Sequence, residues 1–456
     1  MNESKLKSSV TLRMFVMAMV VLFLLILAAT ITSLIAERQH RRNEAVNEVS
    51  QKWGNVQTIT GPVLTVPFRK PTRDAKGKIV FYADCLHIMP ETLQAEVDLN
   101  PEIRYRGIYE AVLYQAAIKL KGTFMLPKLE KYDLSPEHLI LKEAFITVGI
   151  TDLRGIKNAI TPSWVGEKLS ASPGVKLSDI VKSGFTVFPA VNFSQNEYVF
   201  SADLLLNGSG EFNIIPVGKE TLVKMSSTWN SPSFIGNFLP ERREIRPDGF
   251  KAVWSVQHLN RNFPQVWTGS AHSVGNSAFG VKLLQPVDEY QKVTRAVKYA
   301  IMFIVLTFMA FFLTEIFSGT AIHPVQYALI GLAITLFYVI LLSLSEHIPF
   351  NVSYVTASVG IILLISAYAK SVLKTKKAAA VIGGILAALY LFLFVTLQLE
   401  DYALLLGSIG LFVILAVVMF LTRRIDWFDI GGIGKGEKVP LFKKENNLVE
   451  IQEEKD

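Results

Sequence analysis

Uncharged apolar runs and stretches of mixed polarity alternate along this chain. The first apolar run is Met14–Ala36, and a long mixed stretch follows it. Further runs then lie close together, at Tyr299–Phe317, Pro324–Ser345, Asn351–Ala369, Ala378–Leu399 and Tyr402–Leu421. Glu315, near the end of its run, is the one charged residue in any of them. Because a bilayer core requires ~20 apolar helical residues, the pattern predicts six transmembrane helices.

The first run has a second interpretation as a secretory signal peptide. A signal peptide has an apolar core of ~7–15 residues and a cleavage site of small residues. Met14–Ala36 is longer than that, and it ends in Leu34-Ile35-Ala36 without such a site. We therefore interpret it as a membrane anchor that is not cleaved.

The mixed stretch, residues 37–298, is dominated by short segments rich in β-branched and aromatic residues. They are Val63–Val66, Ile79–Tyr82, Ala117–Leu120, Ala144–Val148 and Ala252–Val256. Turn residues separate them, and Asp74–Gly77 and Asn207–Gly210 are expected hairpin connections. The pattern predicts a mostly β domain of sandwich type, formed by one unit or by two packed subdomains.

Two stretches of this domain favour helix, and one favours an irregular loop. Ala45, Val46, Val49 and Trp53 share one helical face, which predicts that the first span continues as a helix to Gly54. Ser135–Lys142 is the second helical candidate. Trp229–Pro240 has no regular period and predicts a structured loop. Its Phe234 and Phe238 either form an exposed contact surface for a partner or lipid, or pack beneath the sheet as a plug.

Lysine and arginine near the short loops indicate the orientation. They are Lys5, Lys7, Arg13, Lys370, Lys374, Lys376, Lys377, Arg423 and Arg424. With six spans all of them lie on one side, and the opposite short loops carry only Glu346-His347 and Glu400-Asp401. Cationic loops resist translocation. We therefore expect residues 1–13 and 422–456 in the cytoplasm, spans at 14–36 and within 299–421, and residues 37–298 exported.

Composition supports a membrane protein and excludes several classes. Of the 456 residues, 50% are hydrophobic and 19% are charged, less than the ~25% of soluble domains. The formal net charge of +7 is dispersed, so we expect no nucleic-acid partner. The single cysteine, Cys85, excludes an internal disulfide and a multi-cysteine metal site.

Few residues suggest catalysis. Cys85 and His87 lie in an alternating, strand-like segment that favours core packing over a thiol nucleophile. The segment Gly431–Gly436 resembles a phosphate loop but lacks the first glycine and the Ser or Thr after Lys435, which favours a linker. We therefore expect no catalytic, metal or cofactor-binding residues.

Two polar pairs at the mouths of the spans are candidate sites. Glu315 and His323 flank a tight loop, where they either exchange a proton or bind a cation, or simply reach head-group water. Glu346-His347, with Glu400-Asp401, either converge into a metal or proton site or are solvated loops.

Residues spread over most of the chain resemble the CreD family of bacterial inner-membrane proteins. The match includes Glu37-Arg38, Gly61-Pro62, Gly107–Tyr109, Asp152-x-Arg154-Gly155-Ile156, Trp229–Pro240, Gly249–Trp254, Lys298–Ile301, Leu306–Phe312, Glu315, His323-Pro324-x-Gln326-Tyr327 and Leu344–His347. The Lys-rich loop 370–377 and the long polar tail depart from it. The resemblance implies a role in cell-envelope integrity or an envelope-stress response, without a catalytic activity to transfer.

The sequence thus predicts a multi-pass α-helical inner-membrane protein that presents a large, mostly β periplasmic domain. The bilayer is the expected first partner, and envelope proteins, lipid or peptidoglycan are further ones; no oligomeric state is predicted. A membrane carrier and a periplasmic enzyme acting on wall or lipid remain alternatives. The carrier is disfavoured because spans three to six contain no charge and no proline inside a helix.

Overall fold

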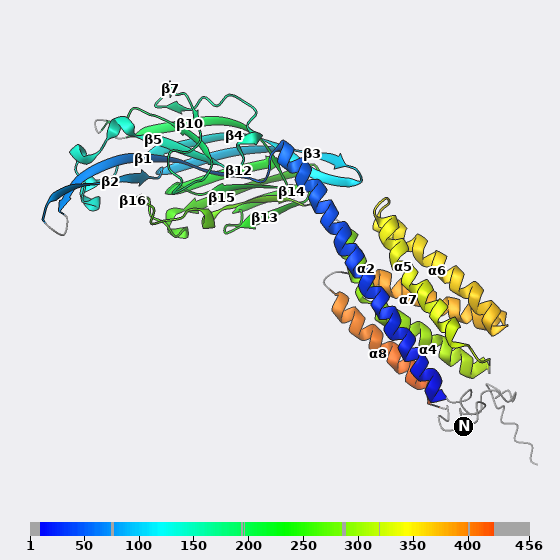
Figure 1. The fold of residues 1–456 in the computed structure, drawn as a ribbon. Helices are drawn as coiled ribbons and strands as arrows, with labels where there is room; N and C mark the ends of the chain where they lie inside the picture. The colour runs from blue at the N-terminus through cyan, green and yellow to red at the C-terminus, as the bar shows by residue number, and fades with distance from the viewer. Residues whose placement is uncertain are drawn as a thin grey trace, which may run out of the picture. The chain divides into compact units, whose positions relative to one another are not determined.

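The computed structural model describes residues 10–73, 77–192, 195, 197–284, 289–318, 320–399 and 402–423. Two compact units divide the chain at Arg41/Arg42 and Val287/Asp288. Helix α2 (Val10–Trp53) is continuous and contributes residues to both (Figure 1). The helical unit and the β-rich unit, Arg42–Val287, are described in turn.

Within the described residues, six helices are long and apolar enough to cross a membrane. After α2 they are α4 (Ala300–Ser318), α5 (Pro324–Ser345), α6 (Phe350–Leu373), α7 (Lys376–Gln398) and α8 (Ala403–Thr422). The six predicted spans are confirmed, with their ends displaced by a few residues. A further helix, α3 (Glu289–Lys298), was not predicted. It is short, and its buried residues alternate with charged ones; they are Tyr290, Val293, Ala296 and Val297.

Helix α2 packs into the helical unit through one face. Leu24, Ala28, Ile31 and Ile35 recur at three- and four-residue spacing, and all are buried in the core of this unit. Gly331 of α5 faces Leu24, where a Cβ would overlap the leucine side chain. The small residue thus lets the two helices approach closely.

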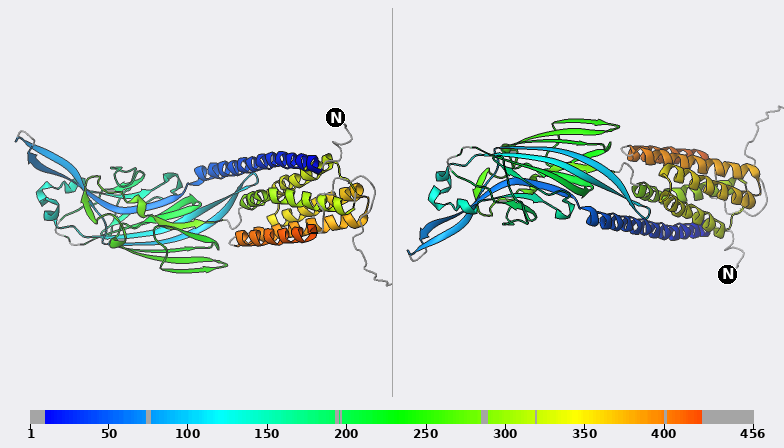
Figure 2. Two further views of the ribbon diagram at one scale, coloured as in Figure 1. Left: turned by 90° about the horizontal axis from the view of Figure 1, so that it is seen from below. Right: turned by 90° about the horizontal axis from the view of Figure 1, so that it is seen from above.

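The β-rich unit is a sandwich of two sheets, which Figures 1 and 2 show as stacked layers. The first sheet has the order β13-β17-β11-β1-β5-β9-β8, with β2 beside β1 and β16 beside β2. The bounds of its strands are β1 Gln57–Arg73, β2 Ile79–Ile88, β5 Phe145–Ile150, β8 Ser172–Pro173, β9 Gly184–Val187, β11 Glu211–Ile215, β13 Pro232–Gly236, β16 Val266–Thr268 and β17 Phe279–Leu283.

The second sheet has the order β14-β15-β12-β3-β4-β10-β6-β7. Its strands are β3 Thr92–Arg106, β4 Tyr109–Phe124, β6 Ser163–Trp164, β7 Glu167–Lys168, β10 Tyr198–Ser209, β12 Glu220–Ser227, β14 Arg242–Arg246 and β15 Gly249–Gln257. In β3, buried Leu93, Ala95 and Val97 alternate with exposed Gln94 and Glu96, so one face meets the core and the other meets solvent.

One hydrophobic core takes side chains from both sheets, including Leu64 and Ile146 of the first and Val97 and Leu120 of the second. The sandwich is therefore a single unit, and the β-rich fold predicted from the sequence is confirmed. Four of the five predicted strand segments lie within strands, and Ala144–Val148 overlaps β5 from Phe145 on; α2 ends at Trp53 as predicted.

Two local predictions were wrong. Asn207–Gly210 does not close a hairpin, because β10 pairs with β4 and β6 whereas β11 pairs with β1 and β17. The chain instead crosses from one sheet to the other at Gly210, whose φ is +67°. Ser135–Lys142 forms two separate 3₁₀ turns, Pro136–His138 and Leu141–Glu143, instead of one helix.

Candidate functional site

Phe234 and Phe238 pack toward the core. The segment predicted as a loop contains strand β13, which pairs with β17. The Phe234 ring lies 5.7 Å from that of buried Trp254, and the Phe238 ring 5.8 Å from that of buried Phe279. Trp254 Nε1 also donates to the Phe238 carbonyl at 3.1 Å. These contacts support the plug interpretation over the exposed contact surface.

Glu315 and His323 have different surroundings. Glu315 is 4% exposed, and Tyr327 Oη donates to its Oε2 at 2.9 Å. His323 is exposed and caps helix α5, where its Nδ1 accepts from the Val325 N–H at 3.3 Å. His323 thus caps the N-terminus of α5, and proton exchange between Glu315 and His323 stays a prediction.

Glu346 and His347 also differ in their surroundings. Glu346 Oε1 accepts from Tyr290 Oη at 3.1 Å, and its Oε2 lies 3.6 Å from Arg38 Nη1 of α2. Glu346 thus joins α2, α3 and the end of α5, while His347 is exposed. Glu400, Asp401 and residues 431–436 lie outside the described residues, so the site proposed with Glu400-Asp401 stays a prediction.

Cys85 and His87 belong to strand β2. Burial, with Asp84 and Asp179 nearby, raises the pKa of the Cys85 thiol, which disfavours the reactive thiolate. His87 is buried, its Nδ1 lies 3.0 Å from Thr65 Oγ1, and burial lowers its pKa. These surroundings support packing over nucleophilic chemistry. Among the described residues, no group of three or more His, Cys, Asp or Glu could hold a metal ion.

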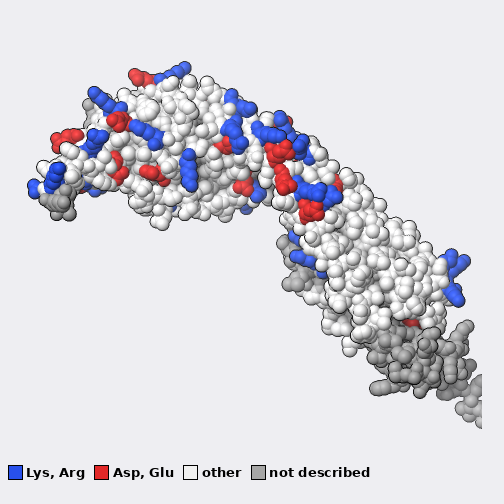
Figure 3. Space-filling view, in the orientation of Figure 1, with Lys and Arg blue, Asp and Glu red and all other residues white. Residues whose placement is uncertain are grey.

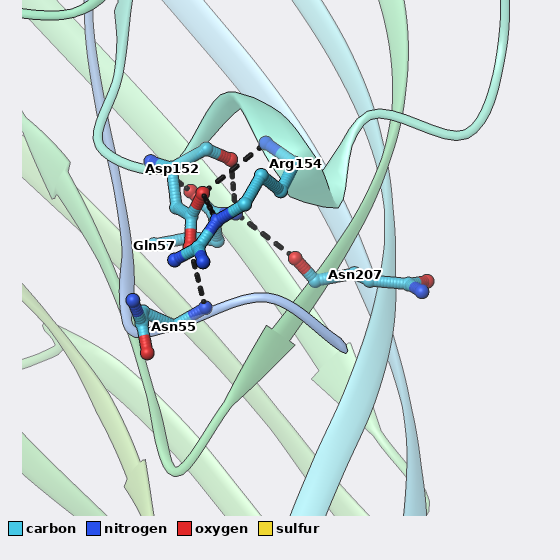
Figure 4. A network of polar contacts seen from close by, with 5 residues as sticks. All are labelled: Asn55, Gln57, Asp152, Arg154 and Asn207. Atoms are coloured by element: carbon cyan, nitrogen blue, oxygen red, sulfur yellow. Dashed lines mark hydrogen bonds and ion pairs between the residues drawn. The ribbon is translucent and has the colours of Figure 1, made fainter. Parts of the chain in front are cut away.

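A buried polar network lies where the chain leaves helix α2 for strand β1 (Figure 4). Asp152 accepts from Arg154 Nε and Nη2 at 2.9 and 2.8 Å, and from the Asn55 N–H at 3.0 Å. The Arg154 guanidinium and these N–H groups hold the pKa of Asp152 below its usual range. The carboxylate therefore fixes the exit of α2 to the turn after β5.

Gln57 extends this network to the second sheet. Its Nε2 donates to the carbonyls of Asp152 and Asn207, both at 2.9 Å (Figure 4). Gly155 is required beside them, because a Cβ there would overlap the Asn207 carbonyl oxygen. Asp152, Arg154 and Gly155, which belong to one sequence motif, thus all take part in this network.

The β1–β2 hairpin carries the surface that sequence analysis missed. The two strands pair from Leu64↔Ile88 out to Arg73↔Ile79, and β16 pairs with β2 only at 86–88. Among the described residues, β2 has no second neighbouring strand over Ile79–Ala83. Exposed fractions there are 62% for Ile79, 71% for Phe81 and 47% for Tyr82.

The two edges of this hairpin differ in composition. β1 carries Arg69, Lys70, Pro71 and Arg73, residue types that discourage further strand pairing. The facing segment Ile79–Ala83 of β2 has neither charge nor proline. Apolar residues occupy successive positions in it, instead of alternating with polar ones. This departure from alternation is the sequence signal that could have identified the exposed apolar segment.

Comparison with known proteins agrees with this architecture. The family model described as inner membrane protein CreD matches residues 9–428. A relative from Escherichia coli (strain K12), inner membrane protein CreD, is 32% identical over 433 residues, which cover 93% of this chain and 95% of the relative. The chain belongs to the CreD family. Within this CreD-family chain, the matched residues include both the network at Asp152 and the helices of the membrane unit.

Proposed function

We propose that this protein supports cell-envelope integrity from the inner membrane, by presenting its β-rich unit in the periplasm to another envelope polypeptide. Both termini lie in the cytoplasm in this proposal. Membership of the CreD family and the six apolar helices support the inner-membrane location. The distribution of Lys and Arg among the short loops supports the orientation.

The observation that carries the proposal is the outer edge of β2 over Ile79–Ala83, which pairs with β1 on one side and, among the described residues, with no strand on the other. An exposed strand edge offers backbone N–H and C=O groups to an extended segment of another chain. The charges and the proline on β1 protect one edge of the hairpin, and the edge along β2 lacks that protection. The occupant is therefore an extended segment of a partner protein that adds a strand along β2.

Two alternatives have less support. A carrier needs polar groups along a path through the bilayer. Glu315 is the buried carboxylate that favours it, and Tyr327 hydrogen-bonds this group near the end of α4. An enzyme acting on wall or lipid would need a cluster of acids in a deep pocket. The cavity of about 300 Å³ beside Trp53 and Arg104 contains one acid, Glu48.

Complementation tests the proposal. A strain that lacks the gene is supplied with wild type, Phe81→Lys or Thr72→Lys, and growth under detergent stress is measured. We expect Phe81→Lys to lose complementation, because a lysine on a strand edge discourages pairing with a further strand, while Thr72→Lys on the already protected strand complements fully. Equal complementation by both variants, at equal membrane abundance, would contradict the proposal.

A further inference from the structure

The outer part of the β1–β2 hairpin has two faces of different chemistry. Arg73 pairs with Ile79, and the register continues inward to Arg69, which pairs with Ala83. Because paired residues of antiparallel strands share a face, and side chains alternate between faces, one face combines two arginines with apolar residues. We call it the arginine face; its exposed residues are Arg69, Pro71 and Arg73 of β1 and Ile79, Phe81 and Ala83 of β2.

On the opposite face of the hairpin, polar groups have partners within the chain. Lys70 Nζ lies 2.9 Å from Asp133 Oδ2, and Tyr82 Oη donates to Asp84 Oδ2 at 2.6 Å. The two arginines of the arginine face, in contrast, form no ion pair with any described residue. Each guanidinium has five N–H donors, which are therefore available to a carboxylate of another chain.

The end of the hairpin has an excess of positive charge. Residues 69–83 contain five Lys or Arg and one acid, Asp74. Lys and Arg, blue in Figure 3, lie around this end of the sandwich, on the left of the view. Such an excess favours a partner of the opposite charge.

The register also fixes the spacing of the negative charges that fit the arginine face. A strand added along β2 places its residues i, i+2 and i+4 on this face, opposite Ile79, Phe81 and Ala83. The outer two positions are in line with Arg73 and Arg69. The added strand lies about 9–10 Å from β1, two strand spacings, which a long arginine and a long acid span together. Ala83 has only a methyl group over which Arg69 must extend, and Ile79 offers apolar surface to the stem of Arg73.

We infer that the segment added along β2 is acidic. It has two acids four residues apart, which pair with Arg69 and Arg73, and an apolar residue midway between them, which packs on Phe81. The inference rests on strand addition along β2, the proposed function, and adds the chemistry of the partner. Backbone hydrogen bonds hold an extended segment on β2, and the two ion pairs select an acidic one.

Peptide binding to the full-length protein in detergent tests the inference. The probe is a fluorescently labelled peptide with two glutamates four residues apart and a valine midway between them, and its analogue has glutamine in place of both glutamates. Fluorescence anisotropy measures the binding of each peptide to wild type, to Arg69→Gln/Arg73→Gln and to Arg242→Gln/Arg246→Gln. This control removes two exposed arginines at the same spacing from the edge strand β14, so both variants have the same net charge.

We expect the glutamate peptide to bind wild type and the control equally, and Arg69→Gln/Arg73→Gln about tenfold more weakly, because two exposed ion pairs are lost. The glutamine peptide should also bind wild type about tenfold more weakly, which tests the charges without altering the protein. Equal binding of the two peptides to wild type, or an equal loss in the two arginine variants, would overturn the acidic partner.

A third variant, Val80→Lys, separates this inference from strand addition itself. Val80 lies on β2 outside the arginine face, and a lysine there discourages strand pairing. We expect it to abolish the binding of both peptides. If it does so while wild type does not distinguish the peptides, strand addition stands and the acidic partner is overturned. If the glutamate peptide binds Val80→Lys as it binds wild type, strand addition along β2 is overturned. If neither peptide binds wild type, the acidic partner is overturned, and complementation by Phe81→Lys still tests the proposed function.

Discussion

The guanidinium of Arg154 lies alongside the carboxylate of Asp152, with Nε and Nη2 each bonded to a different oxygen. Asp152 is 8% exposed, so its charge depends on these donors and on the Asn55 N–H. Asp152 ties the end of helix α2 to the turn after β5, because it also accepts from Asn55, which lies 97 residues earlier in the chain.

Asp152→Asn should lower the free energy of unfolding of the β-rich unit by about 2 kcal/mol, because charge-assisted hydrogen bonds are lost. The pKa of Asp152 is lowered in the folded state, mainly by Arg154. Its contribution is therefore present above the ordinary aspartate pKa of ~3.9 and is lost as the pH falls through the lower folded value. Denaturant unfolding of wild type and variant from neutral pH down through the ordinary aspartate pKa of ~3.9 checks this. A difference that does not shrink at the acid end would contradict it.

Gly155→Ala should destabilise the same unit by about 1–3 kcal/mol, because the added methyl group overlaps the Asn207 carbonyl. Gly275→Ala is the matched control, since a Cβ there meets no atom within 4 Å. Thermal unfolding of the purified full-length variants measures both. Equal stability of the two variants would show that the close approach at Gly155 is not required.

Phe234→Ala should cost about 2 kcal/mol of stability, because the ring packs on Trp254 and Phe250 from a half-buried position. Leu239→Ala, at a side chain that is 72% exposed, should change stability by less than ~0.5 kcal/mol. Denaturant midpoints followed by tryptophan fluorescence compare them. A stable Phe234→Ala protein would favour the alternative of an exposed contact surface.

Glu346→Ala should destabilise the helical unit by about 1–2 kcal/mol, because Tyr290 loses its acceptor and Arg38 loses its ion-pair partner. Exposed His347 supplies the control, His347→Ala. The midpoint of thermal aggregation in detergent is the measurement. Indistinguishable midpoints would mean that the Arg38–Glu346 contact contributes nothing to the packing of α2.

The six spans were predictable because each is an uninterrupted apolar run of bilayer length. Strand existence was predictable from β-branched and aromatic segments. The pairing of the strands was not predictable, because it depends on contacts between residues that are far apart in the chain. Asn207–Gly210 has the composition of a hairpin turn, yet β11 runs parallel to β1 in the other sheet. Helix α3 was not predicted because it is short, and its four buried residues are interspersed with charged residues.

The candidate sites show the same division. Sequence alone placed Phe234 and Phe238 in a structured loop, because two prolines, two asparagines and one glycine in Trp229–Pro240 mask the strand that pairs with β17. Glu346 was recognised as a polar residue at a helix end. Its partners Arg38 and Tyr290 are more than fifty residues away, however, and only folding brings them together.

Photo-crosslinking in intact cells tests strand addition along β2 most directly. A photoreactive amino acid is placed at position 81 on β2 or at position 72 on β1, and cross-linked products are separated and identified after irradiation. We expect one discrete protein partner cross-linked at position 81 and none at position 72, and we expect that product to be lost when Val80→Lys is added. No product at position 81, or the same product at both positions, would contradict it.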